Sequence, residues 1–260
     1  AAVTFLLENG AVVAFRGTDG SLAGWKEDFD FSFRPETEGQ RMAIAYLDTA
    51  GRESSGPLWA TGHSKGGHLA VYAASFCAPA VRERLVAVYS HDGPGFRREI
   101  LDSPGYQAIL PRVRHLLPDS SLVGQLLADR STPVVIKSFA GGINQHDGFT
   151  WSVQRDRFEP ARLSPLGEMA GKAMGGWLEK MDDAARQTFT DTVFSLFEST
   201  GQSTFSGMGD QKLKSAAAMA QAVRLLPKEN QQEVLRMLSQ LGVSSGQAAL
   251  STLLNWNEPK

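Results

Sequence analysis

Residues 61–70, TGHSKGGHLA, decide the fold of this chain. Their Gly-x-Ser-x-Gly core is typical of a nucleophile elbow, in which a strand ends, the chain turns sharply and a helix begins, with Ser64 exposed at the apex. Gly62 and Gly66 are needed because side chains two positions before and after the apex would collide with the incoming helix. The stretch therefore predicts a strand, a nucleophilic serine and a helix.

The segments on both sides support an elbow at Ser64. Residues 57–61, PLWAT, form a short apolar run typical of a buried strand, and residues 67–81 carry Ala and Leu at helical spacing. A second copy of the pattern, GVSSG at residues 242–246, lacks this context because it lies between two helix-like runs. There Gly242 suits a helix C-cap and the serines an N-cap. We expect this copy to connect two helices.

Length, charge and cysteine content limit the class of protein. With 260 residues the chain can form one large α/β domain or a smaller domain with an appendage. The 26 basic and 28 acidic residues nearly cancel, so no nucleic acid or anionic membrane is expected as an obligate partner. The single cysteine, Cys77, excludes an internal disulfide. With no apolar run long enough to span a membrane and no signal peptide, a cytoplasmic location is expected.

Apolar runs predict a mostly parallel sheet. Residues 3–7 and 11–15 are β-rich and flank an Asn-Gly pair, the strongest short hairpin signal. Further strands are expected over residues 85–89, 113–117 and 133–139, and Phe29, Phe31 and Phe33 alternate as a strand would. A helix is expected over residues 41–47. The alternation of strands with helices and long loops predicts an α/β fold.

Three motifs in order carry a family resemblance. FRGT at residues 15–18, GWKEDF at residues 24–29 and the His-Ser-Lys elbow resemble the class 3 (fungal-type) lipases. They resemble still more closely a bacterial lipase-like family of unknown function within the α/β-hydrolases. The resemblance covers roughly residues 1–155 and implies an α/β-hydrolase fold. It also implies that the backbone N–H groups of Thr18 and Lys65 form an oxyanion hole.

The same resemblance places residues 25–33 where the lipases carry their lid. Lys26, Glu27 and Asp28 make this segment more polar than a lid that lies on oil. A soluble or single-chain amphiphilic ester is therefore expected as substrate in preference to a triglyceride droplet.

A serine nucleophile needs a base, and the base needs an orienting carboxylate. In α/β-hydrolases these follow the serine in the order acid, then His, with the His in the loop after the final strand. His146 lies in that loop, whereas His63 and His68 flank the elbow, His115 lies within a strand and His91 comes too early. We predict that His146 is the base.

Two aspartates compete for the role of the acid. Asp119 ends the strand before the last one and is favoured, while Asp92 ends the preceding strand and is the alternative. Alignment with the lipases puts Ser121 at the acid position, which leaves the choice open. Asp147, beside His146, is expected to be solvated.

The C-terminal hundred residues have a helical pattern. We expect a hydrolase core over residues 1–160 and a helical region over 161–260, where apolar stripes are more typical of packed core than of lipid or cofactor sites. The helical stripes are expected over residues 166–181, 189–197, 213–226, 228–241 and 250–256. No metal-ligand spacing, phosphate loop or repeat is present in the sequence, so neither a cofactor nor a metal is expected.

The sequence thus predicts a serine hydrolase that cleaves small-molecule or lipid carboxylic esters through an acyl-enzyme. Acyl transfer or thioester cleavage could use the same groups. The alternative is a binding or scaffold protein that keeps the hydrolase fold and works through its helical tail. An intact elbow, His146 and oxyanion loop favour the enzyme, because a binding protein has no need of a strained serine.

Overall fold

The computed structural model describes residues 1–19, 21–165, 167–169 and 181–198. They belong to two compact units. The first consists of residues 1–18 and 31–183, and the second of residues 19–30 with the chain from residue 184 onwards. The segment 19–30 therefore groups with the C-terminal part of the chain. The boundary expected near residue 160 stays a prediction.

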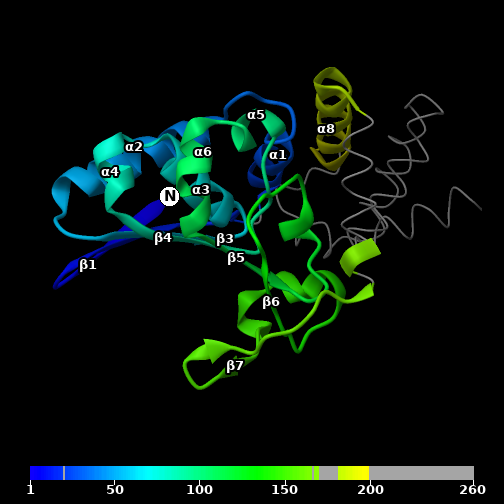
Figure 1. Ribbon diagram of the computed structural model, residues 1–260. Helices are drawn as coiled ribbons and strands as arrows, with labels where there is room; N and C mark the ends of the chain where they lie inside the picture. The colour runs from blue at the N-terminus through cyan, green and yellow to red at the C-terminus, as the bar shows by residue number, and fades with distance from the viewer. Residues whose placement is uncertain (20, 166, 170–180, 199–260) are drawn as a thin grey trace, which may run out of the picture. The chain divides into compact units, whose positions relative to one another are not determined.

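The first unit is built on a six-stranded sheet whose strands lie side by side in their order along the chain (Figure 1). The first two strands are antiparallel, and all later neighbours are parallel. The strands are β1 (Ala2–Leu7), β2 (Gly10–Phe15), β3 (Leu58–His63), β4 (Leu85–His91), β5 (Val113–Pro118) and β6 (Val134–Ile136). The predicted α/β fold, with a mostly parallel sheet flanked by helices, is confirmed.

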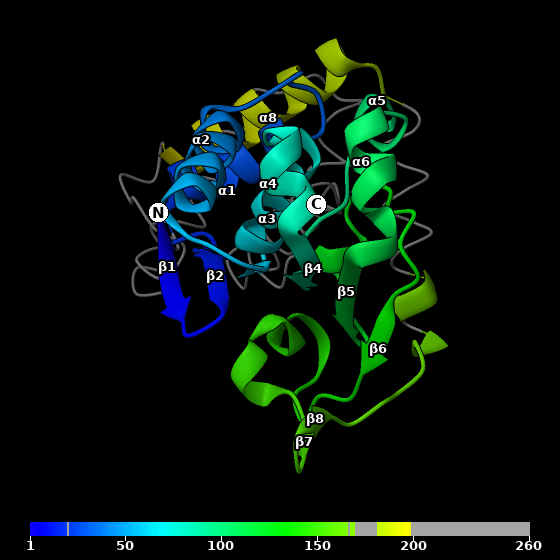
Figure 2. The ribbon, with the colours of Figure 1, turned by 60° about the vertical axis from the view of Figure 1, so that its left-hand side comes forward.

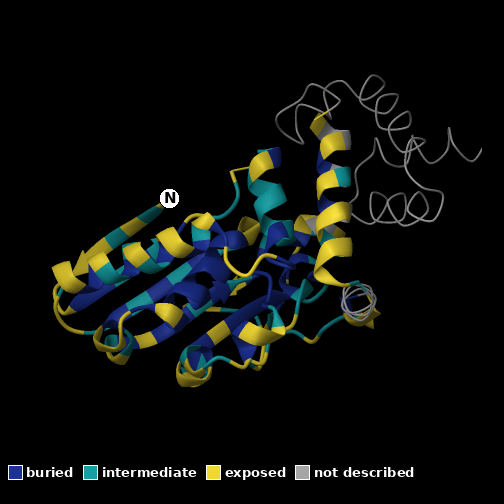
Figure 3. Cartoon of the chain, turned by 90° about the horizontal axis from the view of Figure 1, so that it is seen from above, coloured by how far each residue is buried: buried dark blue, intermediate teal, exposed yellow. Residues whose placement is uncertain are grey.

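Helices of the first unit gather on one face of the sheet, as the views in Figures 1 and 2 agree. They are α2 (Glu38–Glu53), α3 (Lys65–Phe76), α4 (Pro79–Arg84), α5 (Arg98–Leu101) and α6 (Pro104–Ile109). The core lies between them and the strands, where Val13, Ala60 and Val88 meet Leu47 and Ala73, all fully buried. Figure 3 shows this burial along the strands and the inward sides of the helices.

Short elements follow the core strands. Single 3-10 turns are η1 (Leu110–Arg112), η2 (Val123–Gln125), η3 (Gly142–His146) and η4 (Gly148–Thr150), and a small hairpin joins β7 (Val153–Gln154) to β8 (Arg157–Phe158). The helix expected over residues 67–81 is interrupted after Phe76, because Pro79 lacks an N–H and restricts the residue before it. Pro79 instead starts α4.

Residues 29–33 do not form the predicted strand. Residues Leu22–Asp30 are the helix α1, and it follows Ser21, whose Oγ accepts a hydrogen bond from the N–H of Gly24 at 3.0 Å. Such an N-terminal cap favours a helix, and it outweighs the alternation of phenylalanines. Phe31 and Phe33 come after the helix and are buried.

In the second unit, α1 packs against α8 (Asp183–Glu198). The rings of Phe29 and Phe194 meet edge to face with centroids 5.5 Å apart, and Lys26 Nζ lies 2.7 Å from a carboxylate oxygen of Asp191. The stripe expected over residues 189–197 lies in α8. The helices expected over residues 213–226, 228–241 and 250–256, the second Gly-x-Ser-x-Gly copy and most of the 166–181 stripe lie outside the described residues. None of the described helices is long and apolar enough to cross a lipid bilayer.

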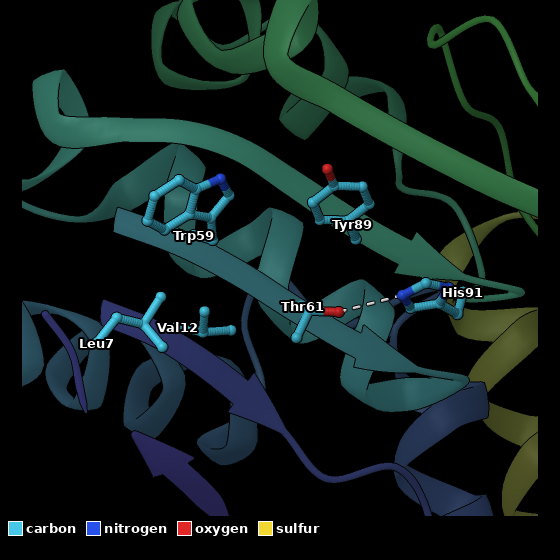
Figure 4. A pocket seen from close by; sticks show the side chains of 6 residues that line it. All are labelled: Leu7, Val12, Trp59, Thr61, Tyr89 and His91. Carbon is cyan, nitrogen blue, oxygen red and sulfur yellow. Dashed lines mark hydrogen bonds between the residues drawn. The ribbon is translucent and has the colours of Figure 1, made fainter. Parts of the chain in front are cut away.

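The side of the sheet opposite the helices bears a shallow apolar groove. Figure 4 shows its lining, formed by Leu7, Val12, Trp59, Thr61, Tyr89 and His91. His91 Nε2 and Thr61 Oγ1 are hydrogen bonded at 3.2 Å. The pKa of His91 is lowered to about 4, chiefly by burial and also by the nearby His63 and His115.

This depressed pKa predicts a pH-dependent stability. In the unfolded chain His91 titrates near pH 6.5, so between pH 6.5 and 4 the unfolded state binds more protons and stability falls as the pH falls. We expect the free energy of unfolding to drop by about 2 kcal/mol more between pH 7 and 4.5 in the wild type than in His91→Phe. Urea titrations at both pH values measure this difference, and equal drops in the two proteins would contradict it.

Candidate active site

Ser64 stands between β3 and α3 in a strained backbone conformation. Its φ is 57° and its ψ is −130°, a region that non-glycine residues rarely enter. Its N–H donates to the carbonyl of His91 at 2.9 Å, and its carbonyl accepts from the N–H of Gly67 at 2.9 Å. Strain of about 1 to 3 kcal/mol is therefore held by backbone hydrogen bonds on both sides of the serine.

The serine is less accessible than an exposed apex implies, since 7% of its surface is exposed. One reason is the loop after β2, which passes directly beside it. A Cβ placed on Gly17 would come within 2.7 Å of the carbonyl oxygen of His63 and 3.5 Å of Ser64 Cβ. This close approach brings the FRGT motif to the elbow.

The glycines around Ser64 are required by the same packing. A Cβ on Gly62 would overlap the backbone of Gly66, and a Cβ on Gly66 would overlap the carbonyl of Phe15. Backbone atoms cannot move aside as the end of a flexible side chain can. Side chains at residues 62 and 66 would therefore collide with the chain where α3 packs against β2 and β3.

We expect Gly62→Ala to lower the free energy of unfolding by about 3 kcal/mol, because the added methyl group forces α3 away from β3. Gly148→Ala is the matched control, since a Cβ there meets no atom within 4 Å, and its effect should stay within about 0.5 kcal/mol. Chemical denaturation of both variants gives the comparison. Equal stability of the two variants would show that the elbow tolerates a side chain at residue 62.

His146 ends η3, and its imidazole ring pairs with the carboxylate of Asp92. His146 Nδ1 and Asp92 Oδ2 are 2.7 Å apart. Asp92 follows β4, is completely buried and has a φ of 51°. Its other oxygen, Oδ1, accepts hydrogen bonds from Ser121 Oγ and, at 3.1 Å, from the N–H of Gly124. The carboxylate is thus fixed at both oxygens, and its bond to Nδ1–H leaves Nε2 of His146 as an acceptor.

Asp119, the acid favoured from the sequence, does not contact His146. One of its oxygens accepts hydrogen bonds from Ser120 Oγ at 3.0 Å and from Gln145 Nε2 at 2.9 Å. Gln145 Oε1 in turn accepts from the N–H of Ser120 at 2.8 Å. Asp119 therefore binds the residue before His146 and anchors its loop, while the structure brings His146 to the alternative carboxylate, Asp92.

His146 also lies beside the elbow. Its ring centroid is 4.6 Å from that of His63, the residue before Ser64. Among the described residues Ser64 Oγ makes no hydrogen bond. Catalytic hydrogen bonds are often long or misaligned in ligand-free enzymes and tighten when substrate binds, so this geometry is compatible with a Ser–His pair.

Thr18 and Lys65, whose N–H groups the resemblance implies for an oxyanion hole, both lie close to Ser64. Thr18 follows Gly17 on the loop beside Ser64. Lys65 is the first residue of α3, and the N–H groups of a helix's first turn point out of its N-terminal end. Lys65 thus follows Ser64 directly in the chain, and Thr18 lies on the loop that packs beside it.

The other titratable groups singled out from the sequence have different surroundings. His68 is buried, and its ring stacks on that of Phe31 with centroids 3.9 Å apart. His115 lies within β5, and its Nδ1 is 3.0 Å from a carboxylate oxygen of Asp129. Asp147 is exposed, and its side chain accepts from the N–H of Phe149. Within the described ranges, no three His, Cys, Asp or Glu side chains are grouped so that they could hold a metal ion.

Sequence reasoning missed three side chains of this site: Ser121 and the pair His63 and Gln145. The lipase alignment pointed to Ser121 as an acid position, where it instead donates to the acid candidate. Nothing in the sequence indicated that His63 and Gln145 hold the His146 loop, since this depends on contacts over 83 and 26 residues.

A family model described as Mbeg1-like matches residues 1–195. The chain has no significant match among curated proteins or among solved structures.

Proposed function

Because the chain belongs to the Mbeg1-like family, which is lipase-like, we propose that it is a serine hydrolase that cleaves carboxylic esters through an acyl-enzyme. The observation that carries this proposal is the 2.7 Å hydrogen bond between His146 Nδ1 and the buried carboxylate of Asp92, on a loop that adjoins the strained Ser64. A nucleophile, a base and an orienting carboxylate are the groups that acyl transfer to serine needs.

In the proposed mechanism Ser64 Oγ attacks the ester carbonyl and His146 Nε2 takes the hydroxyl proton. The imidazolium then gives this proton to the leaving alcohol, and a water molecule repeats the cycle to release the acid. Asp92 fixes the imidazole with Nδ1–H towards itself and stabilises the imidazolium. Its complete burial strengthens that charge interaction, and its bonds to Ser121 and Gly124 keep it in place.

The N–H groups of Thr18 and Lys65 would hold the oxyanion. Two donors fixed by the backbone need no reorganisation when charge develops, and each is worth about 3 kcal/mol of barrier lowering. We propose that the substrate is a small-molecule or lipid ester. Its hydrolysis would follow a mechanism close to that of the class 3 lipases.

A fluorophosphonate probe tests for an activated serine. We expect a single covalent adduct on Ser64 of the wild type, located by mass spectrometry, because only a serine beside a general base reacts readily. Ser64→Ala should lose both the adduct and the hydrolysis of p-nitrophenyl esters while its circular dichroism spectrum stays unchanged. Ester turnover retained by Ser64→Ala would contradict the proposal. Absence of an adduct on folded wild type would favour the binding-protein alternative.

The acid is tested by a pair of isosteric substitutions. Asp92→Asn should lower kcat by about 10³- to 10⁴-fold, since an amide favours the wrong tautomer of the imidazole. Asp119→Asn should lower kcat by less than about 10-fold, because it alters the hydrogen bonds to Ser120 and Gln145 and not the pairing of His146. Steady-state kinetics at pH 8 compare the two, and a larger loss in Asp119→Asn would return the role of the acid to Asp119.

A further inference from the structure

His63, the last residue of β3, makes a contact that the mechanism above leaves unused. Its Nε2 lies 2.6 Å from the backbone carbonyl oxygen of His146. Since a carbonyl can only accept, the imidazole must donate, and this places a hydrogen on Nε2. The residue directly before the candidate nucleophile therefore binds the backbone of the candidate base.

A second side chain holds the neighbouring peptide unit. Trp151 Nε1 donates to the carbonyl of Gln145 at 2.8 Å, and the rings of His63 and Trp151 meet at a steep angle with centroids 6.0 Å apart. The side chain of Gln145 is itself bound to Asp119 and Ala140. Successive carbonyls at residues 145 and 146 are thus held by ring N–H groups, and the bond from His63 ties the loop to the elbow.

The surroundings of His63 favour its neutral form. Burial lowers its pKa below the usual value, and the nearby His146 acts in the same direction. The hydrogen bond to the His146 carbonyl and the carboxylates of Asp92 and Asp147 raise the pKa and so oppose this effect. His91 is the cross-strand neighbour of His63 on β4. A positive charge on His63 would disfavour the imidazolium that His146 forms in the mechanism. Neutral His63 avoids this repulsion.

We propose that His63 is a positioning residue, whose Nε2–H holds the His146 backbone so that the base stays aligned with Ser64. This inference rests on the proposed function. Because His63 and Ser64 are adjacent, the hydrogen bond links the nucleophile to the loop of the base across 83 residues of sequence. A misplacement of a catalytic group by about 1 Å can lower the rate about 100-fold, so this link should affect the chemical step.

Two substitutions separate the hydrogen bond from the ring. His63→Phe keeps an aromatic ring but removes the donor, and we expect kcat to fall by about 10- to 100-fold with KM changed less than about 2-fold. His63→Gln keeps a donor at a similar reach and should stay within about 3-fold of wild-type kcat. Tyr89→Phe is the matched control, since residue 89 is on the neighbouring strand β4 in register with Thr61 and the proposed mechanism assigns it no role, and its kcat should be unchanged. Should His63→Phe not fold, His63→Asn, whose amide is too short to reach the carbonyl, replaces it with the same expected loss.

Hydrogen exchange provides a readout that does not need activity. The N–H groups of Asp147 and Thr150 are bonded within the loop, and we expect both to exchange about 10-fold faster in His63→Phe and at the wild-type rate in His63→Gln. Unchanged exchange in His63→Phe would overturn the positioning role. So would a wild-type kcat in His63→Phe, or a loss in His63→Gln as large as that in His63→Phe. If the wild type hydrolyses no ester, the proposed function fails, while exchange still decides whether His63 holds the loop.

Discussion

The close approach of α3 to the sheet is the constraint on which the candidate site depends. Neither Gly62 nor Gly66 has room for a Cβ, so the strand and the helix meet at backbone distance and the residue between them is forced to a positive φ. That residue, Ser64, is strained because the packing of the whole helix against the strands favours it. The packing of the core between α3 and the sheet therefore holds Ser64 in its strained conformation.

A second strained residue lies at the end of the neighbouring strand. Asp92 follows β4 with a φ of 51°, and the N–H of Ser64 binds the carbonyl of His91, just before it. Both unusual conformations thus occur where adjacent parallel strands end, the edge at which α/β proteins commonly bind ligands. Buried Asp92 is tolerated because hydrogen bonds reach both of its oxygens.

Local signals were sufficient for much of the fold. The Asn-Gly pair predicted the β1–β2 hairpin, and apolar runs predicted the core strands, because each of these depends on neighbouring residues. The cap at Ser21 competed with the alternating phenylalanines, and Pro79 with a run rich in Ala and Leu. In both places two local signals disagreed. The backbone signal, the helix cap at Ser21 or the proline at residue 79, determined the structure over the pattern of side chains.

The acid needed information that no local rule contains. Asp92 and Asp119 both follow parallel strands, so chain order and strand position fit either residue. What separates them is the path of the loop after β6, which brings Gln145 to Asp119 and the next residue, His146, to Asp92. One residue of register in a loop thus changes which carboxylate pairs with His146, and sequence patterns do not determine the register of a loop. The same limit applied to the contact between His63 and His146.

The order of the strands has a consequence for how the chain assembles. Every strand of the sheet after β1 pairs with the one that precedes it in the sequence, so each new strand emerging from a ribosome finds its partner already made. Growth of the sheet therefore requires only the closure of successive loops, which keeps the entropy loss of each step small. Asp92 and Ser64 are synthesised early, but the loop with His146 comes after the last core strand. A nascent chain can thus complete its six-stranded sheet before it holds all the groups of its candidate active site, and any chemistry there would have to wait for the loop after β6.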